Sequence, residues 1–154
     1  MTCRISRASG FTLIELLVVF AIMSLVVGLA PVAMDRMRES AQYRDTVRTA
    51  LSQLKAARDQ AVASGRGAYF VIDLSQRRYG LDTGPLVAVP ESLQMKAVVA
   101  SLEGESSNGR LLIRFLPSGG SSGGSVEIIR NTGSGVRLRV DWLSGRVTQE
   151  ALLP

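Results

Sequence analysis

The sequence of 154 residues has no histidine and only one cysteine, Cys3. Without histidine there can be no Ser-His-Asp triad, no histidine metal ligand and no histidine pH switch. A single cysteine forms neither an internal disulfide nor a cysteine zinc cluster. An enzyme built on this residue set would have to use carboxylates, lysine, tyrosine or serine alone. An enzyme thus remains possible on composition alone, but we predict no catalytic residues, no metal site and no cofactor.

Charged residues are also missing from one long stretch, the nineteen residues 16–34. A helix of about 20 apolar residues crosses the roughly 30 Å hydrocarbon core of a bilayer. Extending the stretch back to Phe11 adds a single charge, Glu15. We therefore expect residues 11–34 to form one transmembrane helix.

The flanks of this stretch indicate its orientation. Arg4 and Arg7 precede it, and basic residues favour the cytoplasmic side, so we expect a cytoplasmic N-terminus and a C-terminal domain outside the cytoplasm. Arg36 and Arg38 follow the stretch and weaken this inference about its orientation. A cleaved secretory signal peptide is the alternative. The apolar run is longer than the usual h-region of about 7–15 residues, and Glu15 stands where such a region is purely apolar.

After the apolar stretch, the pattern remains helical but becomes amphipathic. Apolar residues recur mostly three or four positions apart, and polar residues fill the other face. Ser64 and Gly65 predict the end of the helix, because glycine often follows the last turn. One helix is thus expected over residues 11–63, with a kink or local melting at Pro31. Its second part, within residues 35–66, forms an amphipathic stem.

From residue 67 onward, the pattern changes to short strands. Residues 117–125 read Pro-Ser-Gly-Gly-Ser-Ser-Gly-Gly-Ser and are expected to form a flexible loop. The fold class is therefore α+β, with a long N-terminal helix packed on a small antiparallel β-sheet or sandwich over residues 67–154. The expected strands are residues 68–74, 77–81, 94–100, 110–116, 126–130, 136–143 and 146–149. The clearest alternation puts four apolar residues on one face: Val136, Leu138, Val140 and Trp142.

The junction before the apolar stretch carries the most specific motif. Residues 10–15 read Gly-Phe-Thr-Leu-Ile-Glu. This resembles the processing site of type IV prepilins and type II secretion pseudopilins, a pilin-like family. The resemblance implies that residues 1–10 are a leader peptide. It also implies that a prepilin peptidase cuts between Gly10 and Phe11 and then methylates the nitrogen of Phe11.

The resemblance further implies a role for Glu15 in assembly, as the partner of the N-terminal ammonium of a neighbouring subunit. A carboxylate at the centre of a membrane helix costs about 2.5–3.5 kcal/mol unless it is paired. The cost is lower near the end of the span, where Glu15 lies. Glycine at position 10 fits the cut as well, because the absence of a side chain lets a protease approach the backbone closely.

Three further stretches, residues 54–61, 115–128 and 140–147, resemble the GspH/FimT family of minor pseudopilins. The resemblance implies a non-enzymatic structural subunit of the type II secretion system. It would lie near the tip of the periplasmic pseudopilus and link the tip complex to the shaft for export of folded proteins. It would cross the inner membrane once, with a periplasmic C-terminal domain.

The same resemblance implies the partners. These are the major and other minor pseudopilins, the inner-membrane assembly platform and the prepilin peptidase. We expect the glycine-rich loop to border a partner surface through Pro117, Gly119, Gly120, Gly123 and Gly124.

A minor type IV pilin of the FimT/FimU group, able to bind DNA in natural transformation, is the alternative. Arg137, Arg139 and Arg146 would supply its basic patch. From residue 67 onward, however, nine basic residues stand against eight acidic ones. Arginines that alternate with apolar residues are typical of the solvated face of a sheet. We therefore do not expect nucleic acid as a partner.

The motif makes a direct prediction for processing. When the chain is produced together with a prepilin peptidase, we expect it to lose residues 1–10 and to gain one N-methyl group on Phe11. Intact-mass and N-terminal analysis detects both changes, and the chain produced without the peptidase is the control. An uncut chain, or one that starts near residue 31, would contradict the prediction.

Overall fold

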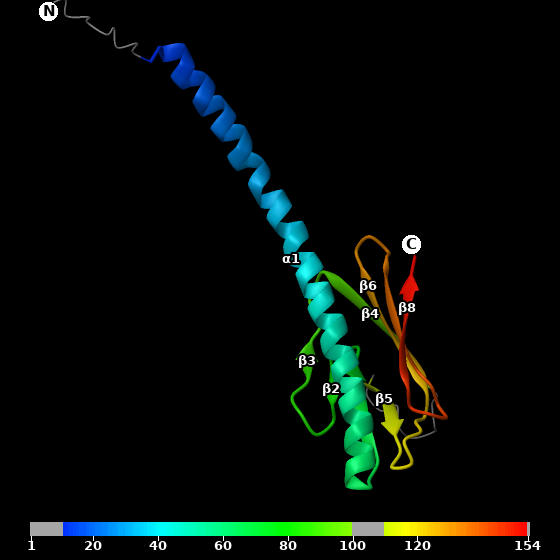
Figure 1. Cartoon of the computed structure of the whole chain (residues 1–154). Coiled ribbons are helices and arrows are strands. Elements are labelled where there is room, and N and C mark those ends of the chain that lie inside the picture. Colours follow the sequence, from blue (N-terminus) through cyan, green and yellow to red (C-terminus); the bar gives the residue numbers. More distant parts are fainter. Residues whose placement is uncertain (1–10, 100–109, 154) are drawn as a thin grey trace, which may run out of the picture. The chain divides into compact units, whose positions relative to one another are not determined.

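The computed structural model describes residues 11–99 and 110–153, which form one long helix followed by eight strands (Figure 1). The leader expected over residues 1–10 lies outside the described residues. The chain divides into two compact units, Met1–Arg38 and Glu39–Pro154, which are described one at a time. The elements are α1 (Leu13–Ser64), β1 (Ala68–Asp73), β2 (Arg78–Leu81), β3 (Val87–Ala88), β4 (Leu93–Val99), β5 (Arg110–Phe115), β6 (Gly124–Arg130), β7 (Gly135–Val140) and β8 (Val147–Leu152).

The first unit contains the N-terminal part of α1. The Thr12 hydroxyl accepts a hydrogen bond from the backbone N–H of Glu15 at 3.3 Å, and this bond caps the first turn. Side chains over residues 11–26 are exposed. In the part of the chain that the structure describes, no helix carries an apolar stretch long enough to cross a membrane. The transmembrane segment expected over residues 11–34 stays a prediction, and the side chains of residues 27–34 lie outside the described residues.

The backbone of α1 is helical without interruption between its ends. The helix predicted over residues 11–63 is therefore confirmed, with each end displaced by no more than two residues. Gly65 follows with φ of 65°, the left-handed conformation that ends many helices. The local melting expected at Pro31 does not occur, since the backbone is helical at this residue and on both sides of it. The proline removes only one backbone hydrogen bond from the helix.

The second unit contains two antiparallel sheets (Figure 1). One sheet has the strand order β3-β2-β1-β5, and the other has the order β4-β6-β7-β8. The last three strands of the second sheet follow one another as a meander, and β4 pairs with the opposite edge of β6. The expected antiparallel β-sheets are confirmed. The two-residue strand β3 was not predicted, because it is too short to show alternation and lies between Pro85 and Pro90.

Burial in β7 follows the predicted alternation along most of its length. Val136, Leu138 and Val140 are buried, and the intervening Arg137 and Arg139 face solvent. A strand exposes successive side chains on opposite faces, so the apolar set lies on the core side.

The predicted place of Trp142 on the same strand face as these three residues is wrong. β7 ends at Val140, and Trp142 lies beyond it with 68% of its surface exposed. Asp141 ends the strand, because its Oδ1 accepts hydrogen bonds from the backbone N–H and the hydroxyl of Ser144, each at 2.8 Å. A short acidic side chain that binds the backbone in this way stabilises a turn at the expense of a strand.

The C-terminal part of α1 supplies one face of the hydrophobic core. Ala50, Leu54, Ala57 and Ala61 are fully buried, and their spacing places them on the same side of the helix. Three of the four are alanine, and such small side chains let the helix backbone approach the sheets. Both sheets complete the core with large side chains: Phe70, Ile72, Tyr79, Ile113, Phe115, Val126, Ile128 and Leu138.

A buried carboxylate ties the β1–β2 turn to the neighbouring strand β5. Asp73 accepts hydrogen bonds from the Ser75 hydroxyl at 2.6 Å and the Gln76 backbone N–H at 2.8 Å. It also accepts one from Arg110 Nε at 3.0 Å. These bonds, the one from Ser75 first, lower the pKa of Asp73 from 3.8 to about 2.

The lowered pKa predicts a pH-dependent stability difference. Asp73→Asn should unfold at a lower temperature than the parent chain at pH 7. The reason is that the ionised carboxylate of Asp73 accepts the hydrogen bonds from Ser75, Gln76 and Arg110 in the folded state. A depressed folded-state pKa stabilises the fold above the unfolded value, and that contribution disappears as pH falls from about 4 towards about 2. The difference in melting temperature should therefore shrink over this range. Asp82→Asn, at an exposed position, is the control. A difference that does not depend on pH would contradict the assignment.

Candidate functional site

The N-terminal motif is accessible where the structure describes it. Gly10 lies outside the described residues, and the side chain of Phe11 is 81% exposed. Glu15 is exposed in the first turn of α1, where a negative charge interacts favourably with the helix dipole. The proposed cut and the assembly role of Glu15 stay predictions.

The glycine-rich segment, residues 117–125, is packed and hydrogen-bonded, so the flexible loop expected there is not observed. The backbone N–H of Leu116 donates to Gly120 O, and that of Gly119 donates to Leu116 O, both at 2.9 Å. The N–H of Ser121 donates to Trp142 O at 2.9 Å. Glycine runs are flexible when isolated, whereas here Gly119, Gly120 and Gly123 are buried against other segments.

Close approach of neighbouring backbone explains why this segment needs glycine. Gly124 has φ of 142°, and a Cβ atom at this position would lie 2.8 Å from Val98 O on β4. The adjoining strand could not pair so closely with any other residue type. The run of glycines thus fits a close crossing of chain segments. Whether it borders a partner stays a prediction.

The β7–β8 turn, residues 141–146, packs on this segment. The N–H of Asp141 donates to Arg146 O, and the N–H of Gly145 donates to Asp141 O, both at 2.9 Å. The hydrogen bonds from the Ser144 backbone and hydroxyl lower the pKa of Asp141. The turn connects β7 to β8, where strands were expected over residues 136–143 and 146–149, and Val140 and Val147 are paired in register at its base.

One arginine of α1 joins the turn to the glycine-rich segment. The Nε of Arg58 donates to Gly119 O at 3.3 Å and to Ser144 O at 3.1 Å. Three segments far apart in the sequence are therefore held at one point. Sequence reasoning placed Arg58 in a family-like stretch but missed this role, because its hydrogen-bond partners lie 61 and 86 residues away.

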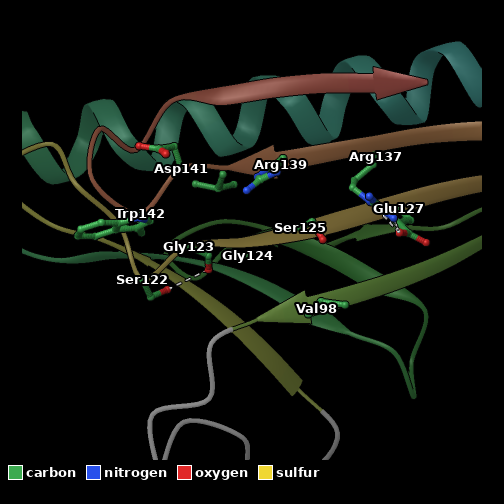
Figure 2. Close-up of a pocket in the computed structure, with 11 residues that line it drawn as sticks. Val98, Ser122, Gly123, Gly124, Ser125, Glu127, Arg137, Arg139, Asp141 and Trp142 are labelled. Atoms are coloured by element: carbon green, nitrogen blue, oxygen red, sulfur yellow. Dashed lines mark hydrogen bonds and ion pairs between the residues drawn. The ribbon is translucent and has the colours of Figure 1, made fainter. Parts of the chain in front are cut away.

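Open grooves lie beside the β7–β8 turn, and two of them are called the first and the second groove. The first has a volume of about 520 Å³ and includes Val98, Gly123, Arg139 and Trp142 in its wall (Figure 2). The second has a volume of about 450 Å³ and lies between the end of α1 and the turn. The second groove is lined by Lys55, Arg58, Asp59, Ser144, Gly145, Arg146 and Val147.

The three arginines of the predicted basic patch do not form one cluster of free cations. Arg137 donates from Nε and Nη2 to Glu127 Oε1 at 2.9 and 2.7 Å, as Figure 2 shows. It also lies 3.7 Å from Glu150, which in turn lies 3.9 Å from Arg139. Arg146 lies instead in the β7–β8 turn.

Strand register extends this pairing across the whole sheet. Lys96 stands opposite Glu127, Glu127 opposite Arg137, and Arg137 opposite Glu150. The outer face of the sheet therefore carries a row of alternating charges, one from each strand. Such a row offers little net attraction for a phosphate backbone.

Comparison with known proteins gives matches to both parts of the chain. Residues 5–31 match the family described as the prokaryotic N-terminal methylation motif. Residues 46–145 match the family described as type II transport protein GspH. Type II secretion system protein H of Xanthomonas campestris pv. campestris is 31% identical over 140 residues, which cover 90% of this chain and 80% of that protein.

A solved structure has a similar fold. The minor pseudopilin EpsH from the Type 2 Secretion System of Vibrio cholerae aligns with a TM-score of 0.56 and 15% sequence identity. The alignment covers 71% of this chain and 97% of that chain. The chain belongs to the GspH family of type II secretion proteins. The resemblance to this family predicted from the sequence is confirmed.

The close crossing at the turn predicts unequal costs for two alanine substitutions. Gly145 and Gly65 have similar φ values, 60° and 65°. A Cβ at Gly145 would collide with Gly119 O and lie tightly against the Arg58 side chain, whereas one at Gly65 meets nothing within 4 Å. Gly65→Ala should lower the free energy of unfolding by about 1 kcal/mol, from the left-handed backbone alone. Gly145→Ala should lower it by at least about 2 kcal/mol. Urea unfolding of the purified chains measures both, and equal losses would contradict the packing argument.

Proposed function

We propose that this member of the GspH family is a minor pseudopilin, a structural subunit of the type II secretion pseudopilus. One observation carries the proposal. The last three residues of the motif Gly-Phe-Thr-Leu-Ile-Glu form the start of a helix that continues without a break into the region matching GspH. A single element thus supplies both a motif for processing and a face of the folded unit.

The processing steps form the first part of the proposal. A prepilin peptidase removes residues 1–10, and the new N-terminal Phe11 is methylated. The match of residues 5–31 to the N-terminal methylation motif supports both steps. The exposure of Phe11 and the cap formed by Thr12 leave the chain just after the cut accessible and outside the helix. The protein is then the substrate of an enzyme and has a structural role of its own.

The membrane anchor forms the second part. Residues 11–34 insert into the inner membrane as one span, with the N-terminus in the cytoplasm and residues 67–154 in the periplasm. The uncharged run of residues 16–34 supports the span. Glu15 then pairs with the Phe11 ammonium of a neighbouring subunit, which offsets the cost of a carboxylate near the apolar phase.

The position in the filament forms the third part. The subunit lies near the tip of the pseudopilus and links the tip complex to the shaft of major pseudopilin. Its partners are other pseudopilins, the inner-membrane assembly platform and the prepilin peptidase. The relatives are named as type II secretion protein H and as a minor pseudopilin, which supports this class of partner. The paired charges on the outer sheet face argue against DNA as a partner.

The charge pairing at Glu15 is tested by removing only the charge. Glu15→Gln should be cut and methylated as efficiently as the parent chain, because the cleaved bond and residues 10–14 are unchanged. Its incorporation into the pseudopilus should fall about tenfold or more, because the ammonium of the neighbour is left unpaired. Fractionation of sheared filaments measures incorporation, and mass analysis measures processing.

Glu91→Gln, an exposed carboxylate in the second unit, is the matched control. Normal incorporation of Glu15→Gln would overturn the pairing role. Loss of cutting in that variant would instead place Glu15 in recognition by the peptidase.

A further inference from the structure

The second groove is lined by more cations than carboxylates. Lys55, Arg58 and Arg146 line it, and Asp59 is the only carboxylate among its lining residues. In the described part of the chain, the carboxylates that form ion pairs within 4 Å are Asp73, Glu127 and Glu150, and none of them contacts these three cations. The lining of the groove thus carries three cations and one carboxylate, and no ion pair within 4 Å engages these cations among the described residues.

Two large apolar side chains stand exposed on the β7–β8 turn, directly before Ser144, with which the lining of this groove begins on the turn. Trp142 is 68% exposed and Leu143 is 71% exposed. Their backbone is held in place, because Ser121 N–H donates to Trp142 O and the carbonyl of Leu143 packs against Gly120. Figure 2 shows Trp142 beside Ser122 and Gly123, at one end of the first groove.

The fold therefore fixes the backbone position of Trp142 and Leu143. Asp141 fixes the turn through Ser144, and Arg58 fixes the turn on α1. A tryptophan exposed on an ordered turn loses little conformational entropy when it is covered. Exposed tryptophan and arginine are also the residue types that contribute most to binding at protein interfaces.

We propose that this turn surface, defined as Lys55, Arg58, Trp142, Leu143 and Arg146, docks a segment of a neighbouring pseudopilin that presents a carboxylate beside an apolar side chain. The inference rests on the proposed function, since it names the chemistry by which one of those subunits is recognised. The carboxylate enters the groove between α1 and the turn, and the apolar side chain covers Trp142 and Leu143.

Charge and size favour a protein segment over a nucleic acid. The groove has a volume of about 450 Å³, which accommodates one or two side chains. Its three cations, Lys55, Arg58 and Arg146, all lie around this one groove. The adjoining sheet face alternates in charge, and Asp141 and Glu150 lie next to Arg146 along a further shallow depression. A duplex needs a continuous basic stripe for its phosphates, and this arrangement does not supply one.

Photocrosslinking tests the proposal, with the full chain produced in cells that contain the other pseudopilins and an active type II secretion system. The photoreactive residue p-benzoylphenylalanine replaces Leu143, and crosslinked products are identified by mass spectrometry. The double variant Lys55→Glu and Arg146→Glu reverses both charges while sparing Arg58, which the fold uses. Arg78→Glu, an exposed arginine outside both grooves, is the matched control.

We expect position 143 to crosslink to another pseudopilin, with the yield reduced about tenfold or more in the double variant and unchanged in the control. Changing the contacted carboxylate of that partner to lysine should restore the yield in the double variant. Crosslinking that does not respond to the charge reversal, or that yields only DNA adducts, overturns the proposal.

The two levels of failure are separable. A chain that co-purifies with the other pseudopilins but gives no crosslink at position 143 refutes the turn surface alone. A chain that does not co-purify with any pseudopilin refutes the proposed function and the inference together.

Discussion

The folded unit depends on the burial of one helix face made mostly of alanine. Ala50, Ala57 and Ala61, with Leu54 among them, occupy the positions where α1 meets the sheets. Because these side chains are small, the large residues come from the strands, and Phe70, Tyr79 and Phe115 fill the space. Burial of this apolar surface provides the main stabilisation of such a core. A bulkier residue at any of the three alanines would overpack the contact between the helix and the sheets.

Much of this architecture could be predicted from the sequence. The helix and seven strands follow from changes in the spacing of apolar residues, and the end at Gly65 follows from glycine's backbone freedom. The family follows from a short contiguous motif and three further stretches. These signals are local, so a single sequence contains them.

The features that sequence reasoning missed are those that depend on distant contacts. The glycine-rich segment has the composition of a loose loop, and only its packing against β4, the β7–β8 turn and Arg58 shows why glycine is required. Trp142 continued an alternating pattern, yet Asp141 ends the strand before it. The basic patch was predicted from a list of arginines. Register then placed Glu127 and Glu150 against Arg137.

The row of alternating charges on the outer sheet face also bears on self-association. β8 is the edge strand of its sheet, and an open edge can add a strand from another molecule. The row ends on that edge with the carboxylate of Glu150. Two identical edges joined about a two-fold axis near this residue would bring two carboxylates face to face, which disfavours the pairing. An edge of this kind disfavours pairing with a second copy of the same chain.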